Sequence, residues 1–132
     1  MPIEWRDRLS VGNDMVDDDH KALIGIVNEF EHALTTKDAE EVEDVFRRLL
    51  TYTEEHFERE EALQTAIHFP ERKAHKEEHL RLKWALSDIH EQFVGKEYGS
   101  LSELKDLLRD WLLHHIVEED MKMAPYLKGG RG

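Results

Sequence analysis

Five histidines and two acidic residues occur along this chain at separations that suit metal binding from helices. The set consists of His20, His56, Glu60, His75, His79, His115 and Asp120. Side chains four positions apart lie on one face of an α-helix, one turn from each other, and the set contains an H-x-x-x-E pair and an H-x-x-x-H pair. Imidazole suits iron, zinc and copper, and carboxylates bind hard cations. Seven such side chains exceed the needs of one metal ion, so they favour two adjacent ions bridged by the acids.

Four amphipathic stretches must position these side chains. Within each stretch, apolar residues follow one another at steps of three and four, which is typical of a helix with one buried face. The predicted helices span residues 18–35, 39–66, 70–94 and 101–120. Because the connections between them are short, neighbouring helices should be antiparallel. The expected fold class is all-α, an up-down-up-down four-helix bundle, with residues 1–16 as an extended N-terminal arm that packs on it.

This topology brings the seven side chains to one end of the bundle. His20 lies near the start of the first predicted helix and His56 near the end of the second. His75 and His79 lie near the start of the third, and His115 lies near the end of the fourth. In an antiparallel bundle these positions share one level. Burying so many polar groups without a partner costs about 1–3 kcal/mol for each unsatisfied group, so an internal metal site is predicted.

Length and composition narrow the function classes. The 132 residues suit one domain spanning 1–132, and the net charge of −12 argues against nucleic acid and against anionic membrane surfaces as partners. The chain has no run of apolar residues long enough to cross a membrane and no apolar segment typical of a signal peptide. It has no cysteine, hence no disulfide and no thiolate ligand. These features fit a cytoplasmic protein.

Competing motifs leave some choices open. The HKEEH run at 75–79 matches a zinc-protease pattern, but Glu78 lies about 100° from His79 around the helix, so it shares that face only in part. Glu29 and His32 form a single E-x-x-H unit, whereas carboxylate-bridged di-iron bundles use two. His32, His68 and His90 are expected at the surface. His114 competes with His115, which lies better on the apolar stripe, and Glu118 and Glu119 compete with Asp120 as the second acid.

The chain resembles the hemerythrin family, in particular its single-domain bacterial members. The matching stretches are DDDHKALIGIVN, HFEREE, HKEEH and WLLHHIVEED, and the resemblance covers essentially the whole chain. It implies a pair of iron ions with an oxo or hydroxo bridge, both also bridged by Glu60 and Asp120. It implies three histidines on one iron, His75, His79 and His115, and two on the other, His20 and His56. The acid before His20 departs from the family, which often has glutamine there.

The function implied by the resemblance is reversible dioxygen binding, for oxygen storage, delivery or sensing, rather than catalysis. We expect Ile24, Trp111 and Leu112 near the bound gas, because they lie one turn from His20 or His115. A di-iron peroxidase, a nitric-oxide or oxygen reductase, or an iron-storage protein would be the alternatives. The expected protein is a monomer whose ligand is dioxygen, with an oxygen-consuming enzyme as a further partner.

Overall fold

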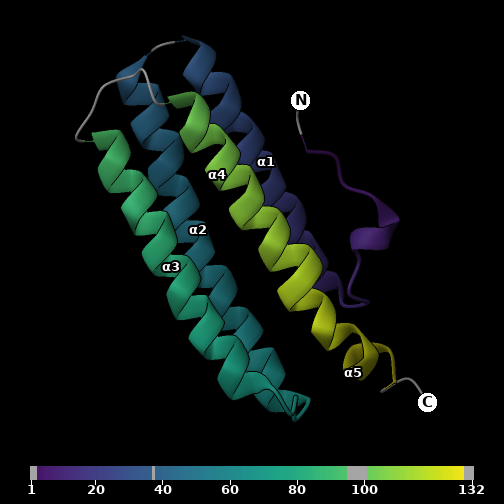
Figure 1. Ribbon diagram of the computed structural model, residues 1–132. Coiled ribbons are helices and arrows are strands. Elements are labelled where there is room, and N and C mark those ends of the chain that lie inside the picture. The colour runs from purple at the N-terminus through teal and green to yellow at the C-terminus, as the bar shows by residue number, and fades with distance from the viewer. Residues whose placement is uncertain (1–2, 37, 95–100, 130–132) are drawn as a thin grey trace.

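The protein is an antiparallel bundle of four long helices (Figure 1). The computed structural model describes residues 3–36, 38–94 and 101–129. The helices are α1 (Asp14–Thr36), α2 (Ala39–Ala66), α3 (Arg72–Val94) and α4 (Leu101–Leu113). A π-helical turn η3 (His114–Glu119), a 3₁₀ turn η4 (Asp120–Met123) and a short helix α5 (Ala124–Gly129) follow α4. Helix α1 packs on α2 and α4, and α3 packs on the same two helices from the other side. The predicted all-α bundle is confirmed.

One half of the bundle is an ordinary apolar core. Its central side chains come from all four long helices and are at most 6% exposed: Leu23, Val27, Phe30, Phe46, Leu49, Leu82, Leu86, Ile89, Leu108 and Leu112. Phe30 and Phe46 meet edge to face across α1 and α2, with ring centroids 5.4 Å apart. The same apolar core continues to the polar cluster, since it includes Phe57, which stacks on His79. Within the described ranges, no helix is long and apolar enough to span a membrane.

The first helix starts earlier than predicted. It begins at Asp14 instead of residue 18, because Asn13 caps it: the Asn13 side-chain oxygen accepts a hydrogen bond from the Val16 N–H at 3.0 Å. Helix α2 begins after Asp38, whose carboxylate accepts bonds from the N–H groups of Glu40 and Glu41, as the capping pattern predicts. Helix α3 begins at Arg72, two residues later than predicted.

The end of the fourth predicted helix differs most from expectation. The segment 101–120 was predicted as one regular helix, but it becomes π-helical at His114 and passes into a 3₁₀ turn at Asp120. Pro125 occupies the first turn of α5, where proline is tolerated because no backbone N–H is needed there.

The N-terminal arm is fastened to α1 by two sets of hydrogen bonds. It is irregular apart from a 3₁₀ turn, η1 (Asp7–Leu9), and it ends at Asn13 instead of residue 16. The Asn28 side chain accepts from the Ile3 N–H at 2.9 Å and donates to the Ile3 carbonyl at 2.8 Å. The Asp17 carboxylate accepts from the Ser10 hydroxyl at 2.5 Å and from the buried Val11 N–H at 2.9 Å.

Replacing Asp17 should therefore loosen the arm. In Asp17→Ala the Val11 N–H is left buried without an acceptor, which costs about 1–3 kcal/mol of the free energy of unfolding. The matched control is Asp18→Ala, because Asp18 is exposed and adjacent. Urea denaturation of the metal-free protein measures both variants. Equal unfolding midpoints for the two would show that this bond does not hold the arm.

Candidate metal centre

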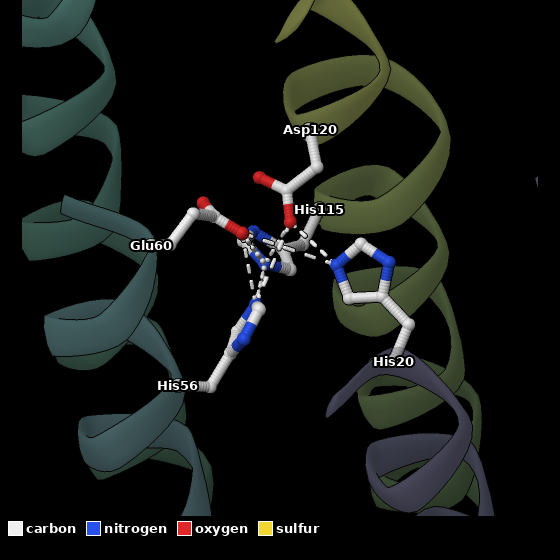
Figure 2. A group of neighbouring side chains, drawn as sticks. All are labelled: His20, His56, Glu60, His115 and Asp120. Carbon is white, nitrogen blue, oxygen red and sulfur yellow. Dashed lines mark hydrogen bonds and ion pairs between the residues drawn. The ribbon is translucent and has the colours of Figure 1, made fainter. Parts of the chain in front are cut away.

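The seven side chains singled out in the sequence meet at one end of the bundle. His20 comes from α1, His56 and Glu60 from α2, His75 and His79 from α3, and His115 and Asp120 from the segment after α4. All seven are at most 3% exposed. Figure 2 shows five of them pointing toward a common centre from three parts of the chain. The predicted convergence on one buried site is therefore observed.

The two carboxylates lie between two sets of histidines. Glu60 directs Oε1 at the Nε2 atoms of His75 and His79, at 2.8 and 2.9 Å, and Oε2 at His56 Nε2, at 3.0 Å. Asp120 divides its oxygens in the same sense: Oδ1 lies 2.9 Å from His75 Nε2, whereas Oδ2 lies 2.6 Å from His20 Nε2. Each acid thus offers one oxygen to each set, which is the arrangement that bridging ligands need.

The ligand atoms form two overlapping groups, each compact enough for one cation. One group contains His20, His56 and His115, the other contains His75 and His79, and both include Glu60 and Asp120. In each group the ligand atoms lie within 4.8 Å of one another. Glu60 Oε2 is fully buried and accepts no well-directed hydrogen bond, although His56 Nε2 lies 3.0 Å from it. A buried carboxylate oxygen without a donor is costly, so the donor set fits a pair of cations better than it fits hydrogen bonding alone.

The His115 ring lies slightly nearer to the His56 ring than to the His79 ring. The resemblance places it with His75 and His79, but its Nε2 atom is 2.9 Å from His56 Nε2 and 2.7 Å from Asp120 Oδ2. The margin is small, because its ring centroid is 5.1 Å from that of His56 and 5.6 Å from that of His79. Either division leaves three histidines on one side and two on the other.

The π-helical turn explains the five-residue step between His115 and Asp120. The Asp120 N–H donates to the His115 carbonyl, five residues earlier, instead of to the carbonyl four residues earlier. A regular α-helix would have brought Glu119 to the face of His115. Glu119 instead lies near His114 and Lys122, and the Glu118 side chain is 64% exposed. Of these three acids, Asp120 is the one that lies in the cluster with the histidines.

Two further carboxylates contact histidines of the cluster at Nδ1, the ring nitrogen that faces away from the centre. The Nδ1 atom of His56 lies 3.0 Å from Asp19 Oδ2, and that of His79 lies 2.9 Å from Glu61 Oε2. Phe57 stacks on the His79 ring, with centroids 3.9 Å apart and planes 6° apart. The sequence drew attention to the acid before His20, but Asp19 contacts His56 on the facing helix α2. No spacing rule within one helix could have indicated that contact.

Charge in the cluster is strongly coupled. Burial lowers the pKa of His75, but hydrogen bonds and charge from Asp120 and Glu60 outweigh it and raise this pKa to about 10. Burial and the charge of Asp120 raise the pKa of Glu60, yet the close contacts with His56 and His75 bring it down to about 2. Burial dominates at His115 and lowers its pKa. The carboxylates thus stay ionised. They favour positive charge close to them, either as protons on histidines or as metal ions.

The residues of the competing motifs mostly lie outside the metal-binding cluster. Glu78 turns toward Arg81 and His114, so HKEEH does not form a protease site. Glu29 pairs with Arg48, and His32 is exposed. His90, which was expected at the surface, is half-buried against Glu43, at 3.0 Å.

The three residues predicted to line an oxygen pocket are all buried. Ile24 is 4% exposed, Leu112 is fully buried, and Trp111 is 6% exposed. The Trp111 indole N–H donates to the Leu82 carbonyl at 2.9 Å, which fixes the orientation of the ring. Their role around a bound gas stays a prediction.

A small surface pocket reaches the cluster at His75. Its volume is about 290 Å³, and Phe69, Glu78, Glu119 and Lys122 contribute to its walls. His75 is the most exposed of the seven, at 3%. This pocket is therefore a place where the otherwise enclosed centre approaches solvent.

Comparison with known proteins agrees with this geometry. The model of the family described as "Hemerythrin HHE cation binding domain" matches residues 11–127. The chain belongs to the hemerythrin family. A bacteriohemerythrin of Pseudomonas aeruginosa is 32% identical over 119 residues, covering 89% of this chain and 76% of the relative. Another, from Stenotrophomonas maltophilia, is 31% identical over 126 residues, covering 96% and 82%.

Solved hemerythrin structures have the same architecture. A crystal structure of wild-type hemerythrin aligns with a TM-score of 0.85 at 26% identity, covering 96% of this chain and 98% of that one. The family resemblance inferred from the sequence motifs is thus confirmed in both sequence and fold.

The two adjacent histidines after α4 should differ sharply in their effect on metal content. His115 is fully buried in the cluster, whereas the His114 side chain is 42% exposed and contacts Glu118. We expect His115→Ala to lose most of the bound metal and His114→Ala to retain it, as measured by elemental analysis of the purified variants. Similar metal content in both would contradict the assignment of His115.

Proposed function

We propose that the seven side chains bind two iron ions bridged by Glu60 and Asp120, and that the protein reversibly binds dioxygen there. One observation carries the proposal: each carboxylate directs one oxygen at each of two histidine sets. Membership of the hemerythrin family supports iron as the metal. The donor set agrees, because imidazole and carboxylate ligands suit iron and the chain has no cysteine to form a thiolate site.

The ligand count supports an open coordination position. Five imidazole nitrogens and four carboxylate oxygens supply nine of the twelve positions around two octahedral ions. A solvent-derived oxo or hydroxo bridge would occupy one position on each ion, which leaves a single position free. When bound, a pair of ferrous ions supplies the electrons for reversible uptake of dioxygen.

The surroundings favour binding over catalysis. Phe57, Leu112 and Ile116 are fully buried and belong to the apolar core that adjoins the cluster. Such an enclosure limits water entry and the separation of charge that accompanies oxygen reduction. Among the described residues, the buried acids outside the ligand set are Asp17 and Asp19, and both already accept hydrogen bonds from other groups. Neither is free to serve as a proton donor.

Absorption spectroscopy under controlled gas tests this function. The diferrous protein should develop a visible absorption band on exposure to air and lose it under vacuum, over repeated cycles. Immediate and irreversible conversion to the diferric form would contradict reversible binding. Sustained peroxide turnover with a reductant would indicate an enzyme, and many irons per chain in elemental analysis would indicate iron storage.

A further inference from the structure

The five histidines of the centre differ in how firmly their rings are held. His56 and His79 have their Nδ1 atoms against carboxylates, those of Asp19 and Glu61. By contrast, the Nδ1 atoms of His20 and His115 are buried without a hydrogen-bond partner. A carboxylate at Nδ1 keeps the proton on that nitrogen and leaves the Nε2 lone pair free for a metal. The tautomer of only some ligands is therefore fixed from outside the cluster.

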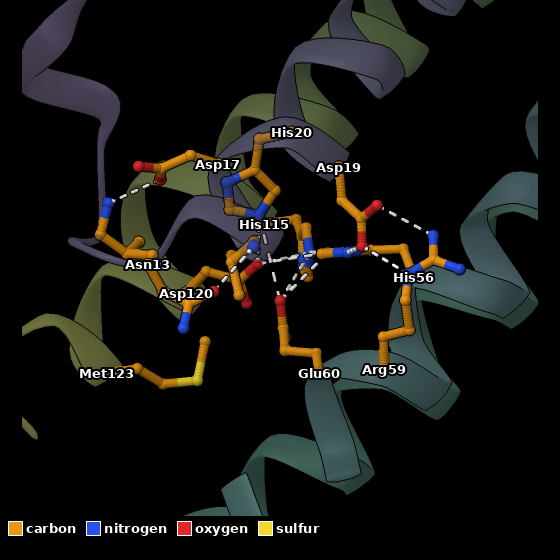
Figure 3. A network of polar contacts seen from close by, with 12 residues as sticks. Asn13, Asp17, Asp19, His20, His56, Arg59, Glu60, His115, Asp120 and Met123 are labelled. Atoms are coloured by element: carbon orange, nitrogen blue, oxygen red, sulfur yellow. Dashed lines mark hydrogen bonds and ion pairs between the residues drawn. The ribbon is translucent and has the colours of Figure 1, made fainter. Parts of the chain in front are cut away.

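Asp19 is the more strongly held of the two supporting acids. Arg59 donates to both of its oxygens, each at 2.9 Å, and the Tyr52 hydroxyl donates to Oδ1 at 2.8 Å. The Asp19 side chain is 7% exposed, whereas that of Glu61 is 30% exposed. Figure 3 shows Arg59 reaching Asp19 from the turn that also carries Glu60, with His56 on the other side of the carboxylate.

Asp19 and Arg59 carry opposite charges, and they change the electron donation of the His56 imidazole in opposite directions. A negative carboxylate at the Nδ1–H makes the imidazole a better electron donor through Nε2, which stabilises the more oxidised metal. A guanidinium bound to the same carboxylate draws charge away from it and acts in the opposite direction. The Asp19 carboxylate is 7% exposed, so solvent screens its charge weakly, whereas the Arg59 side chain is 38% exposed and its charge is screened more.

We propose that Asp19 and Arg59 are positioning residues that together set the redox balance of the metal centre through His56. Asp19 fixes the ring and donates charge, and Arg59 limits that donation. The inference rests on the proposed di-iron centre. Asp19 occupies the position before His20 in α1, yet it contacts His56 on the facing helix.

Two variants that each remove one charge test the proposal by the sign of their effects. Asp19→Asn keeps an acceptor for the His56 N–H but removes the negative charge, so it should shift the equilibrium toward the diferrous form, by about tenfold or about 59 mV for one electron. Arg59→Gln should shift it in the opposite direction, and Arg59→Lys should stay close to the parent protein. Redox titration followed by absorption measures all three. Glu61→Gln is the matched control, with a smaller shift expected because Glu61 is more exposed.

A second readout covers the case in which a variant holds iron poorly. Cobalt(II) affinity of the metal-free proteins should fall about 10–100-fold in Asp19→Asn and by less in Glu61→Gln. Equal losses in these two variants, or redox shifts of the same sign in Asp19→Asn and Arg59→Gln, would overturn the proposal. Failure of the unaltered protein to hold two irons would instead overturn the proposed function, so the two failures are distinguishable.

Discussion

Two fully buried carboxylates, on Glu60 and Asp120, impose the main physical constraint on this protein. Removing an ionised carboxylate from water costs several kcal/mol unless positive charge and hydrogen bonds replace the lost hydration. Here five imidazoles surround the two acids, and the pKa values of both carboxyl groups stay below their ordinary range. This end of the bundle therefore needs compensating positive charge, which two bridged metal ions would supply.

Other features of the fold follow from the need to place positive charge around these two carboxylates. Four helices are needed because the histidines approach from several directions. The apolar core, with Phe30, Phe46 and their neighbours, packs the helices against one another. The N-terminal arm and the segment after α4 close the polar end, and Asp17 ties the arm to α1 close to the cluster. Where regular helix geometry would misplace a ligand, as at Asp120, the backbone departs from it through a π-helical turn.

Much of this arrangement could be predicted from the sequence, since helical periodicity and antiparallel topology are both local rules. They placed His56, Glu60, His75 and His79 on the correct faces. The failures have a common cause in contacts between segments distant in sequence. The start of α1 depends on the Asn13 cap, and the contact of Asp19 with His56 depends on the packing of α1 on α2. The iron that His115 would bind stays a prediction, because its ring centroid is 5.1 Å from that of His56 and 5.6 Å from that of His79.

Anomalous diffraction at the iron absorption edge, from crystals of the iron-loaded protein, tests the central claim most directly. Two iron peaks are expected, on the order of 3.5 Å apart. One oxygen of Glu60 and one of Asp120 should be bound to each iron. A single iron peak, or two peaks without both carboxylates spanning them, would contradict it.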